Sequence, residues 1–397
     1  MKPDAGAARA GARNVIVVTA AVDGPGQTDR AAGALAQVLA GASGHVVRLV
    51  GLTRGPGAVG GPDGNGIPTA VLYPGAGDPG APWVPQTVTE RLDLRAHLGE
   101  RRRRLLRAVA VRRLARIFAA VPDGIVIVMH EEAGELVAAV PAPHLRVIGR
   151  GRESFAAAHR AKAAAGDPRR AQLKRLFADA DLFAVRTRAD AVAFWRDGFC
   201  NVVVLPDPLT FWPEVSARRT EPSAVAVEDH RADGTVPALI DAWAGVRKRH
   251  PGWTLRVFGE GPDTAVLGEY AARRGLTDAV VLAGDASAAP AALQAASFYV
   301  SAALHDVPPL LREAQACGLP CVAVNSGPGL REFVDDCDAL LVPARRPDLL
   351  AAACSRLIGD GDLRHAMGSA AREKALRLGS AASAGRLWTE ALAAVER

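Results

Sequence analysis

The sequence predicts two α/β domains in series, each a doubly wound, Rossmann-like parallel sheet with helices on both faces, facing each other across a cleft. Three observations support this prediction. The length of 397 residues exceeds that of one ordinary domain. Short β-branched runs alternate with helical patterns from end to end. The alternation pauses once, after Pro206, in a segment with four prolines and no clear period.

Six strands are expected in the first half, each a short apolar run followed by a helical pattern. They are NVIVVTA, HVVRLVGL, GIVIVMH, HLRVIG, DLFAVRT and NVVVLP. Between the second and third, the Gly- and Pro-rich stretch from Arg54 to Pro85 predicts irregular chain. We therefore expect a loose tail at 1–13, a first domain at 14–205 and a linker at 206–222.

The second half repeats the same alternation, with the strands SAVAVE, WTLRVFG, AVVLAG, SFYVSA, PCVAVN and ALLVPA. It predicts a second domain at 223–379, followed by a helix at 380–397 that crosses back to the first domain. In parallel sheets of this kind, ligands bind beyond the carboxyl ends of the strands. The cleft between the domains is therefore the expected site.

Residues 100–121 are strongly basic and predict an amphipathic helix. Four apolar residues form a core-facing stripe at every fourth position: Leu106, Ala110, Leu114 and Phe118. The arginines from Arg101 to Arg116 form either a solvated face or a peripheral contact with anionic lipid or an anionic polymer acceptor. Nucleic acid is disfavoured as a partner, because no aromatic residues are interleaved for base stacking.

Composition indicates a cytoplasmic protein without a metal centre, with the basic helix as a potential membrane contact. No apolar run reaches the length of a membrane span, and the N-terminus lacks the apolar core of a signal sequence. The five cysteines are odd in number and scattered, which favours reduced thiols. Cys317 and Cys321 have no partner pair at zinc-ligand spacing.

Three strand-to-helix turns of the second half are the candidate site. Gly259, Glu260 and Gly261 follow a strand and open a helix, where glycines allow close approach of a phosphate or sugar. An ordinary strand-to-helix turn uses the same residues. A later turn contains Ser326 and Gly327. Because these turns share one sheet edge, together they favour a nucleotide-sized pocket.

The third turn lies in SAALHDVPPLLREAQACGLP, where the helix is expected to begin at Pro308 and Pro309. Asp306, Val307 and Pro308 are the candidates for holding phosphate and sugar at this helix N-terminus. Glu313, about one turn further along, either binds a pair of ribose hydroxyls or is an ordinary surface glutamate.

The chain from about Ser223 onward resembles the donor-binding domain of retaining glycosyltransferases of the GT-B fold, family 4. The motifs PALIDAWAGVRKRHPGWTLRVFGEGPD, AVVLAGDASAAPAALQAASFYVSAALHDVPPLLREAQACGLPCVAVNSGPGLREFVDDCDALLVPARRPDLLAAA and LRHAMGSAAREKAL stand in family order and at family spacing. The first half is similar only in LKRLFADADLFAVRTRADAVAFWRDGFCNVVVLPDPL. The resemblance implies an acceptor-side loop at Gly24 and Gly26.

Three positions depart from the family pattern. Glu228 and Asp233 stand where the family has an Arg and a Lys that hold the donor diphosphate, and His305 replaces the first of its two glutamates. A carboxylate about 4 Å from a phosphate would cost on the order of 4 kcal/mol at an effective dielectric near 20. Positive charge from His230, Arg231 or a protonated His305 would compensate in part.

The resemblance implies retaining, metal-independent sugar transfer from a nucleotide-sugar to an acceptor, with no cofactor beyond that donor substrate. His305 and Arg231 are then the candidates that assist the leaving group. The altered positions leave two alternatives: a catalytically silent relative that binds a protein partner, and a GT-B enzyme with an atypical donor.

Overall fold

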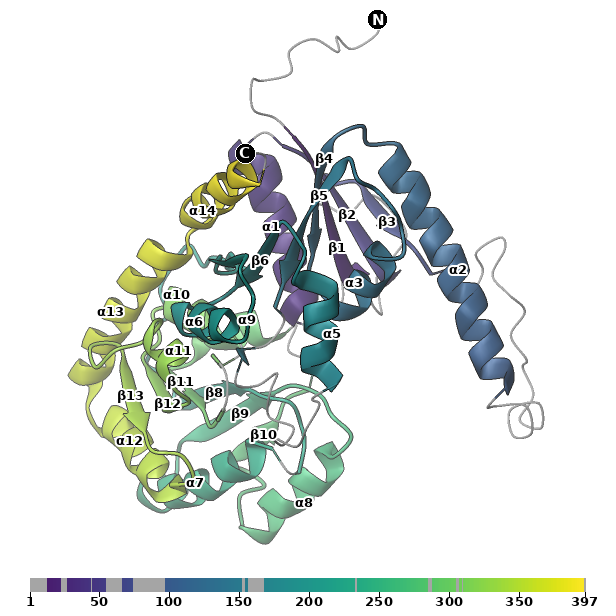
Figure 1. The fold of residues 1–397 in the computed structure, drawn as a ribbon. Helices are drawn as coiled ribbons and strands as arrows, with labels where there is room; N and C mark the ends of the chain where they lie inside the picture. The colour runs from purple at the N-terminus through teal and green to yellow at the C-terminus, as the bar shows by residue number, and fades with distance from the viewer. Residues whose placement is uncertain are drawn as a thin grey trace, which may run out of the picture.

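The computed structural model describes residues 13–22, 27–43, 45–54, 66–73, 97–151, 154–155, 168–232, 234–284, 288–304, 307–308 and 310–395. Within these residues the chain forms two separate parallel sheets, one above the other in Figure 1. The predicted fold class, two doubly wound α/β units, is confirmed.

The first sheet has seven strands in the described residues, in the order β3-β2-β1-β4-β5-β6-β7, all parallel. The strands are β1 (Asn14–Val22), β2 (Val46–Arg54), β3 (Thr69–Val71), β4 (Gly124–Val128), β5 (Leu145–Arg150), β6 (Leu182–Val185) and β7 (Val202–Val204). The order reverses direction at β1, so the loops after β1 and β4 flank the crevice where such sheets bind ligands.

Strand β3 corrects the expectation of irregular chain from Arg54 to Pro85. Thr69, Ala70 and Val71 pair in parallel with Leu49, Val50 and Gly51 of β2 and extend the sheet at its edge. Three residues between Gly- and Pro-rich flanks are too short a run for the sequence pattern to reveal. The backbone groups of β2 nevertheless require partners on that side, and β3 supplies them.

The second sheet has six parallel strands in the described residues, in the order β10-β9-β8-β11-β12-β13. They are β8 (Ser223–Val227), β9 (Thr254–Phe258), β10 (Val280–Leu282), β11 (Phe298–Ser301), β12 (Cys321–Val324) and β13 (Ala339–Val342). The order reverses at β8, and the loops after β8 and β11 therefore flank the second sheet's ligand crevice.

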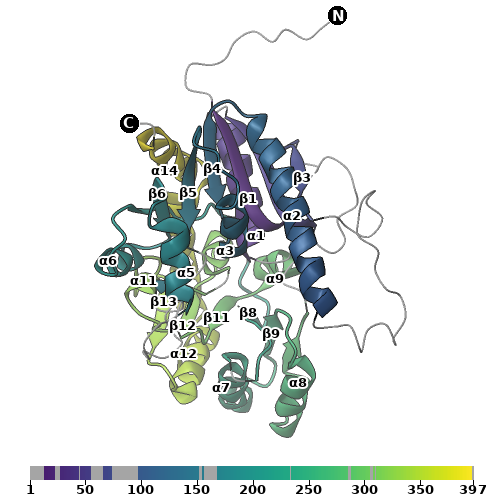
Figure 2. The same cartoon turned by 45° about the vertical axis from the view of Figure 1, so that its right-hand side comes forward.

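Helices cover both faces of each sheet, as Figures 1 and 2 show. The helices of the first unit are α1 (Gln27–Ser43), α2 (His97–Ala119), α3 (Glu131–Val137), α5 (Pro168–Phe177) and α6 (Arg188–Arg196). Those that follow are α7 (Val236–Arg249), α8 (Thr264–Arg273), α9 (Ala289–Ala295), α10 (Leu311–Ala316), α11 (Pro328–Arg331), α12 (Pro347–Gly359), α13 (Gly361–Gly379) and α14 (Ala381–Ala394).

Each sheet has an apolar core on both faces, because strands buried on two sides need cover on two sides. In the first unit, α2, α3, α5 and α6 pack on one face around Phe183 and Phe194. Helix α1 packs on the other face through Leu35. In the second unit, α7, α8 and α12 cover one face and α9, α10 and α11 the other.

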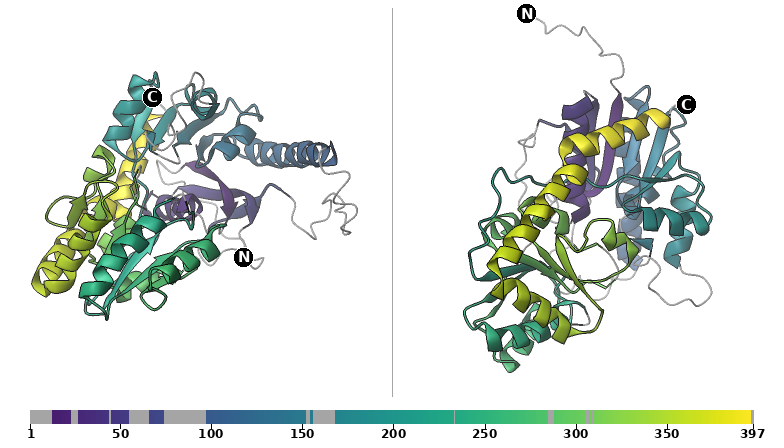
Figure 3. Two further views of the ribbon diagram at one scale, coloured as in Figure 1. Left: turned by 90° about the horizontal axis from the view of Figure 1, so that it is seen from below. Right: turned by 90° about the vertical axis from the view of Figure 1, so that its left-hand side faces the viewer.

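The last helices run from the second unit back to the first, as the yellow helices on the right of Figure 3 show. Helix α13 contacts α10, whereas α14 packs on α1. Trp388 of α14 is fully buried in the core of the first sheet with Leu35 and Leu39. The C-terminal helix therefore stabilises a domain that begins more than three hundred residues earlier in the chain.

The segment from Leu205 to Pro222, between β7 and β8, contains no helix or strand, yet it is held firmly to the second unit. The Ala217 amide donates to Cys317 O at 2.7 Å, and the Arg372 guanidinium lies over the Trp212 ring at 5.4 Å. These contacts fix the path by which the chain leaves the first sheet.

Helix α2 extends beyond the body of the molecule at its N-terminal end, as the left view of Figure 3 shows. Ala110, Leu114 and Phe118 are buried as the periodicity predicts, but Leu105 is 61% exposed. Leu106, the first residue of the predicted stripe, is only partly buried, so the fully buried part of the stripe begins at Ala110. Among the described residues, no helix combines the length and the apolar character that crossing a membrane requires.

We predict that Trp388→Ala lowers the free energy of unfolding by about 3–5 kcal/mol, because the deleted indole leaves a cavity between α14 and the first sheet. Urea denaturation followed by circular dichroism measures this change. Trp195→Ala is the matched control, since Trp195 is 67% exposed and its loss should change stability little. Equal effects of the two substitutions would contradict the role assigned to α14.

Candidate functional site

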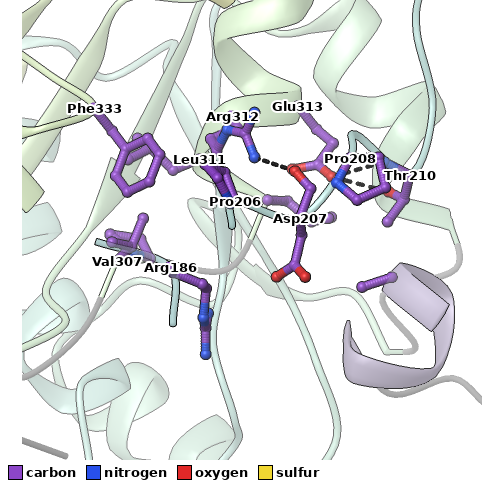
Figure 4. A pocket seen from close by; sticks show the side chains of 13 residues that line it. Arg186, Pro206, Asp207, Pro208, Thr210, Val307, Leu311, Arg312, Glu313 and Phe333 are labelled. Atoms are coloured by element: carbon purple, nitrogen blue, oxygen red, sulfur yellow. Dashed lines mark hydrogen bonds between the residues drawn. The ribbon is translucent and has the colours of Figure 1, made fainter. Parts of the chain in front are cut away.

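A pocket lies where the carboxyl ends of the two sheets meet. Its lining comes from both units: Ala31, Arg186, Pro206, Asp207, Pro208 and Thr210 from α1 and the segments after β6 and β7, and Val307, Pro308, Leu310, Leu311, Arg312, Glu313 and Phe333 from the second unit. Figure 4 shows these side chains from close by. Three residues predicted from the sequence, Val307, Pro308 and Glu313, are therefore brought together here.

Asp207 is the centre of the polar contacts at this junction. Arg150, which ends β5 and is buried, donates from Nε to the Asp207 carboxylate at 2.8 Å and also forms an ion pair with it. Arg312 of α10 donates to the Asp207 carbonyl oxygen, as Figure 4 shows. Asp207, three residues beyond the end of β7, is thus bonded both to the first sheet and to the second unit.

The charges around Asp207 decide its protonation state. Burial alone would raise the pKa of this carboxyl, but the guanidinium groups of Arg150, Arg186 and Arg312 outweigh burial and lower the pKa. Burial also lowers the pKa of Arg150. The pair therefore remains ionised, and breaking it by removing one partner would leave an uncompensated buried charge.

Glu313, predicted as the ribose ligand, has a second partner that the sequence does not reveal. It is buried in α10, and its Oε1 accepts from the Thr210 amide at 3.1 Å and from the Thr210 hydroxyl at 3.0 Å. The alternative of an ordinary surface glutamate is wrong, because 6% of the residue is exposed. Its Oε1 faces the segment after β7 while the side chain lines the pocket.

The turn before α10 differs from the prediction. The helix begins at Leu311, not at Pro308, because Leu310 adopts a left-handed conformation at φ 56° and stands as the N-cap. A leucine with left-handed backbone angles is strained, and Leu310 is also buried. Backbone strain of this kind is concentrated at functional turns. His305, Asp306 and Pro309 lie outside the described residues.

Glu228 is an internal carboxyl at the carboxyl end of β8. It is 6% exposed, and it accepts hydrogen bonds from the Ser301 hydroxyl at 2.5 Å and the Thr235 hydroxyl at 2.7 Å. The three residues tie the ends of β8 and β11 to the start of α7. Burial raises the pKa of Glu228 to about 7, although both hydroxyl bonds act in the opposite direction.

Gly259 and Gly261 are required by the contact between two loops. Gly259 has φ 143°, and a Cβ there would lie 2.0 Å from Glu228 O. A Cβ on Gly261 would lie 2.2 Å from His230 O. Close approach of the chain to itself is therefore sufficient to require glycine at both positions. Glu260 between them is exposed, and its carbonyl accepts from the His230 amide.

His230 does not supply the compensating positive charge that we expected. It is fully buried, its Nδ1 lies 3.1 Å from the Thr264 hydroxyl, and burial lowers its pKa. The neutral ring packs between the loops after β8 and β9.

The remaining predicted residues are dispersed along the carboxyl edge or lie outside the described part. Arg231 is exposed in the loop after β8. Ser326 and Gly327 follow β12, and Gly327 has φ 132° with open space around its Cα. None of these three lines the pocket described above. Gly24, Gly26 and Asp233 lie outside the described residues.

Sequence reasoning missed the cationic side of the pocket. Arg150 ends β5, and Arg186 and Asp207 follow β6 and β7 within a few residues; that placement was the available signal. His130, two residues after β4, has a similar placement, and it was missed for the same reason. No group of three or more His, Cys, Asp or Glu in the described part of the chain could hold a metal ion.

The fold is shared with proteins of known structure. Sucrose-phosphate synthase from Thermosynechococcus elongatus superposes with a TM-score of 0.71 at 19% identity, covering 96% of this chain and 100% of that one. HepE of Anabaena, solved in complex with UDP-glucose, gives a TM-score of 0.71 at 15% identity over 96% and 99% of the chains. These matches define the class of the protein: an α/β protein of the GT-B fold.

The second unit carries the more particular likeness. Residues 227–360 match the family model described as Glycosyl transferases group 1. An exopolysaccharide phosphotransferase of Streptomyces coelicolor is 36% identical over 148 residues, which are 36% of this chain and 16% of the length of that protein. The predicted resemblance of the second unit to glycosyltransferases is thereby confirmed.

We predict that the stability of the protein depends on pH through Glu228. Its folded pKa of about 7 lies above the ordinary 4.5, so its favourable contribution is complete below the ordinary value and is lost as the pH rises through about 7. Glu228→Gln, which mimics the protonated form, should remove this loss, worth on the order of 3 kcal/mol.

Urea denaturation on the acid and alkaline sides of neutrality tests this prediction. The Glu228→Gln variant should gain stability relative to wild type as the pH rises, whereas Glu373→Gln, at an exposed position, should follow wild type throughout. A constant difference between Glu228→Gln and wild type at every pH would show that Glu228 titrates normally.

Proposed function

We propose that the chain is a glycosyltransferase that moves a sugar from a nucleotide-sugar donor to an acceptor, with retention and without a metal ion. The observation that carries the proposal is the match of residues 227–360 to group 1 glycosyltransferases, in a chain whose two units meet at one pocket. The complex of HepE with UDP-glucose supports a uridine nucleotide as the donor carrier. No cofactor besides the donor is proposed.

The proposed roles extend the resemblance to the donor-binding domain, and for Glu313, Val307 and Pro308 the lining of the pocket supports them. Glu313 binds ribose with the carboxylate oxygen that Thr210 leaves available, and the turn at Asp306, Val307 and Pro308 holds sugar and phosphate. Glu260, Ser326 and Gly327 contact the donor from the loops after β9 and β12, outside the lining of the pocket. His305 and Arg231 assist the departing nucleotide. The acceptor lies against the first unit, and its candidate contacts are Gly24, Gly26 and His130, which follow β1 and β4 in the sequence.

Glu228 favours a second candidate, a chain that binds nucleotide or a protein partner without transferring sugar. Its carboxyl accepts hydrogen bonds from Ser301 and Thr235. The position where the family has a cation for the donor diphosphate therefore carries none. Substituting Arg there would bury a cation among groups arranged for a carboxyl. Binding without transfer, across a panel of donors and acceptors, would favour this candidate over the first.

A peripheral contact through α2 is part of the proposal. The N-terminal end of the helix extends from the body, and exposed Leu105 lies beside exposed arginines. An apolar side chain among cations suits the surface of an anionic membrane, where each basic residue contributes about 1 kcal/mol. An anionic polymer acceptor would attract the same arginines, but unlike a membrane it has no apolar interior for Leu105.

Donor binding is tested with Glu313→Gln and isothermal titration calorimetry against nucleotide sugars. The amide oxygen still accepts from Thr210, but the charged bond to ribose is lost, so donor affinity should fall about tenfold or more. Thr210→Val is the matched control: it removes one internal hydrogen bond and should affect donor affinity less. If wild type bound no nucleotide sugar or nucleoside diphosphate, the proposed function would be wrong.

Membrane contact is tested by co-sedimentation with vesicles. We expect wild type to bind vesicles rich in anionic phospholipid and not neutral ones, with binding weakened by salt. The pair Arg112→Glu and Arg116→Glu should weaken binding about tenfold or more. Arg356→Glu with Arg377→Glu changes the net charge equally at exposed positions elsewhere and is the control. If both double variants lost vesicle binding equally, net charge alone would explain the binding, and α2 would not be the contact surface.

A further inference from the structure

Helix α6 of the first unit receives a carboxylate from the second unit at its N-terminus. Glu332, directly after α11, accepts from the Arg188 amide through Oε2 and from the Ala189 amide through Oε1, both at 2.8 Å. These two amides begin α6. The two residues of each pair stand more than 140 positions apart, so the bonds join the two units.

The rest of the α6 N-terminus is satisfied within the first unit. The Thr187 hydroxyl accepts from the Asp190 amide at 3.0 Å and donates to the Asp190 carboxylate at 2.6 Å. A helix leaves its first amides without partners inside the helix, and their partial positive charge favours an anion. Of the first three amides of α6, two are thus bonded by Glu332 and one by the helix's own cap.

The contact adjoins the pocket on both sides. Arg186, two residues before the first of the two bonded amides, lines the pocket from the first unit, and Phe333, the neighbour of Glu332, lines it from the second. The Phe333 ring also lies 5.5 Å from the Arg312 guanidinium. The two elements also pack beside each other, since a Cβ at Gly329 would be in ordinary van der Waals contact with the Thr187 side chain.

We propose that Glu332 is a positioning residue that latches the second unit closed on the first and so completes the pocket between them. Opening exchanges the two charge-assisted bonds for water and moves the walls formed by Arg186 and Phe333 apart. That the pocket holds the substrate rests on the proposed function; the latch itself does not. The contact between Glu332 after α11 and the N-terminus of α6 thus holds the two units together beside the pocket.

The test uses Glu332→Ala and Glu332→Gln in the full chain, without any substrate. Hydrogen exchange should accelerate up to about tenfold at the Arg188 and Ala189 amides in the alanine variant, because both amides lose a charged acceptor. Small-angle X-ray scattering should show a larger radius of gyration. Glu332→Gln, which keeps the shape and loses the charge, should show a smaller change in both measurements.

Asp336→Ala, at an exposed acidic position four residues further along, is the matched control and should leave exchange and scattering as in wild type. Unchanged exchange at the two amides in Glu332→Ala would overturn the proposal. So would faster exchange with unchanged scattering, since Glu332 would then cap α6 without holding the units together. Neither readout requires a donor or acceptor, so a failed latch and a failed proposed function are distinguishable.

Discussion

The relation between the two sheets depends on Asp207, whose carboxylate forms an ion pair with the buried Arg150. Asp207 stands where the chain leaves the first sheet, and its carboxylate is bonded to the end of β5 while its carbonyl oxygen is bonded to Arg312 of α10. Thr210, three residues on, is bonded to Glu313 of the same helix. The carboxyl edges of both sheets therefore face one pocket, because one short segment is bonded to each of them. Its two flanking prolines limit the alternative paths.

The altered residue at the end of β8 is part of this architecture. A carboxylate beside a diphosphate would repel it by several kcal/mol, which makes Glu228 difficult to reconcile with a nucleotide-sugar donor. The structure removes most of the conflict, since Glu228 is bonded to Ser301 and Thr235, and burial raises its pKa to about 7. With a pKa of about 7, the carboxyl is uncharged in about half of the molecules at neutral pH. The position thus serves to join β8, β11 and α7, and under the proposed function other groups hold the donor.

The sequence predicted the fold well because the alternation of apolar strands and helices is a local signal that repeats along the whole chain. It predicted three residues of the pocket, since Val307, Pro308 and Glu313 lie in one recognisable motif. It could not reveal Arg150, Asp207 or Glu332, whose partners lie 57 to 144 positions away. Nor could it distinguish glycines that accommodate a ligand from Gly259 and Gly261, which accommodate the chain itself. Strand β3 and the left-handed conformation of Leu310 could not be predicted for a related reason. Contacts with neighbouring segments determine both, and local sequence propensity does not.

The proposed function requires that the pocket between the units bind a nucleotide while Glu228 remains internal. A crystal structure of the full chain with a nucleoside diphosphate, UDP first, tests it most directly. We predict the diphosphate beside the turn that contains Val307 and Pro308, the ribose at Glu313, and Glu228 still bonded to Ser301 and Thr235. A nucleotide bound away from this pocket, or a Glu228 side chain turned out toward the diphosphate, would contradict the account.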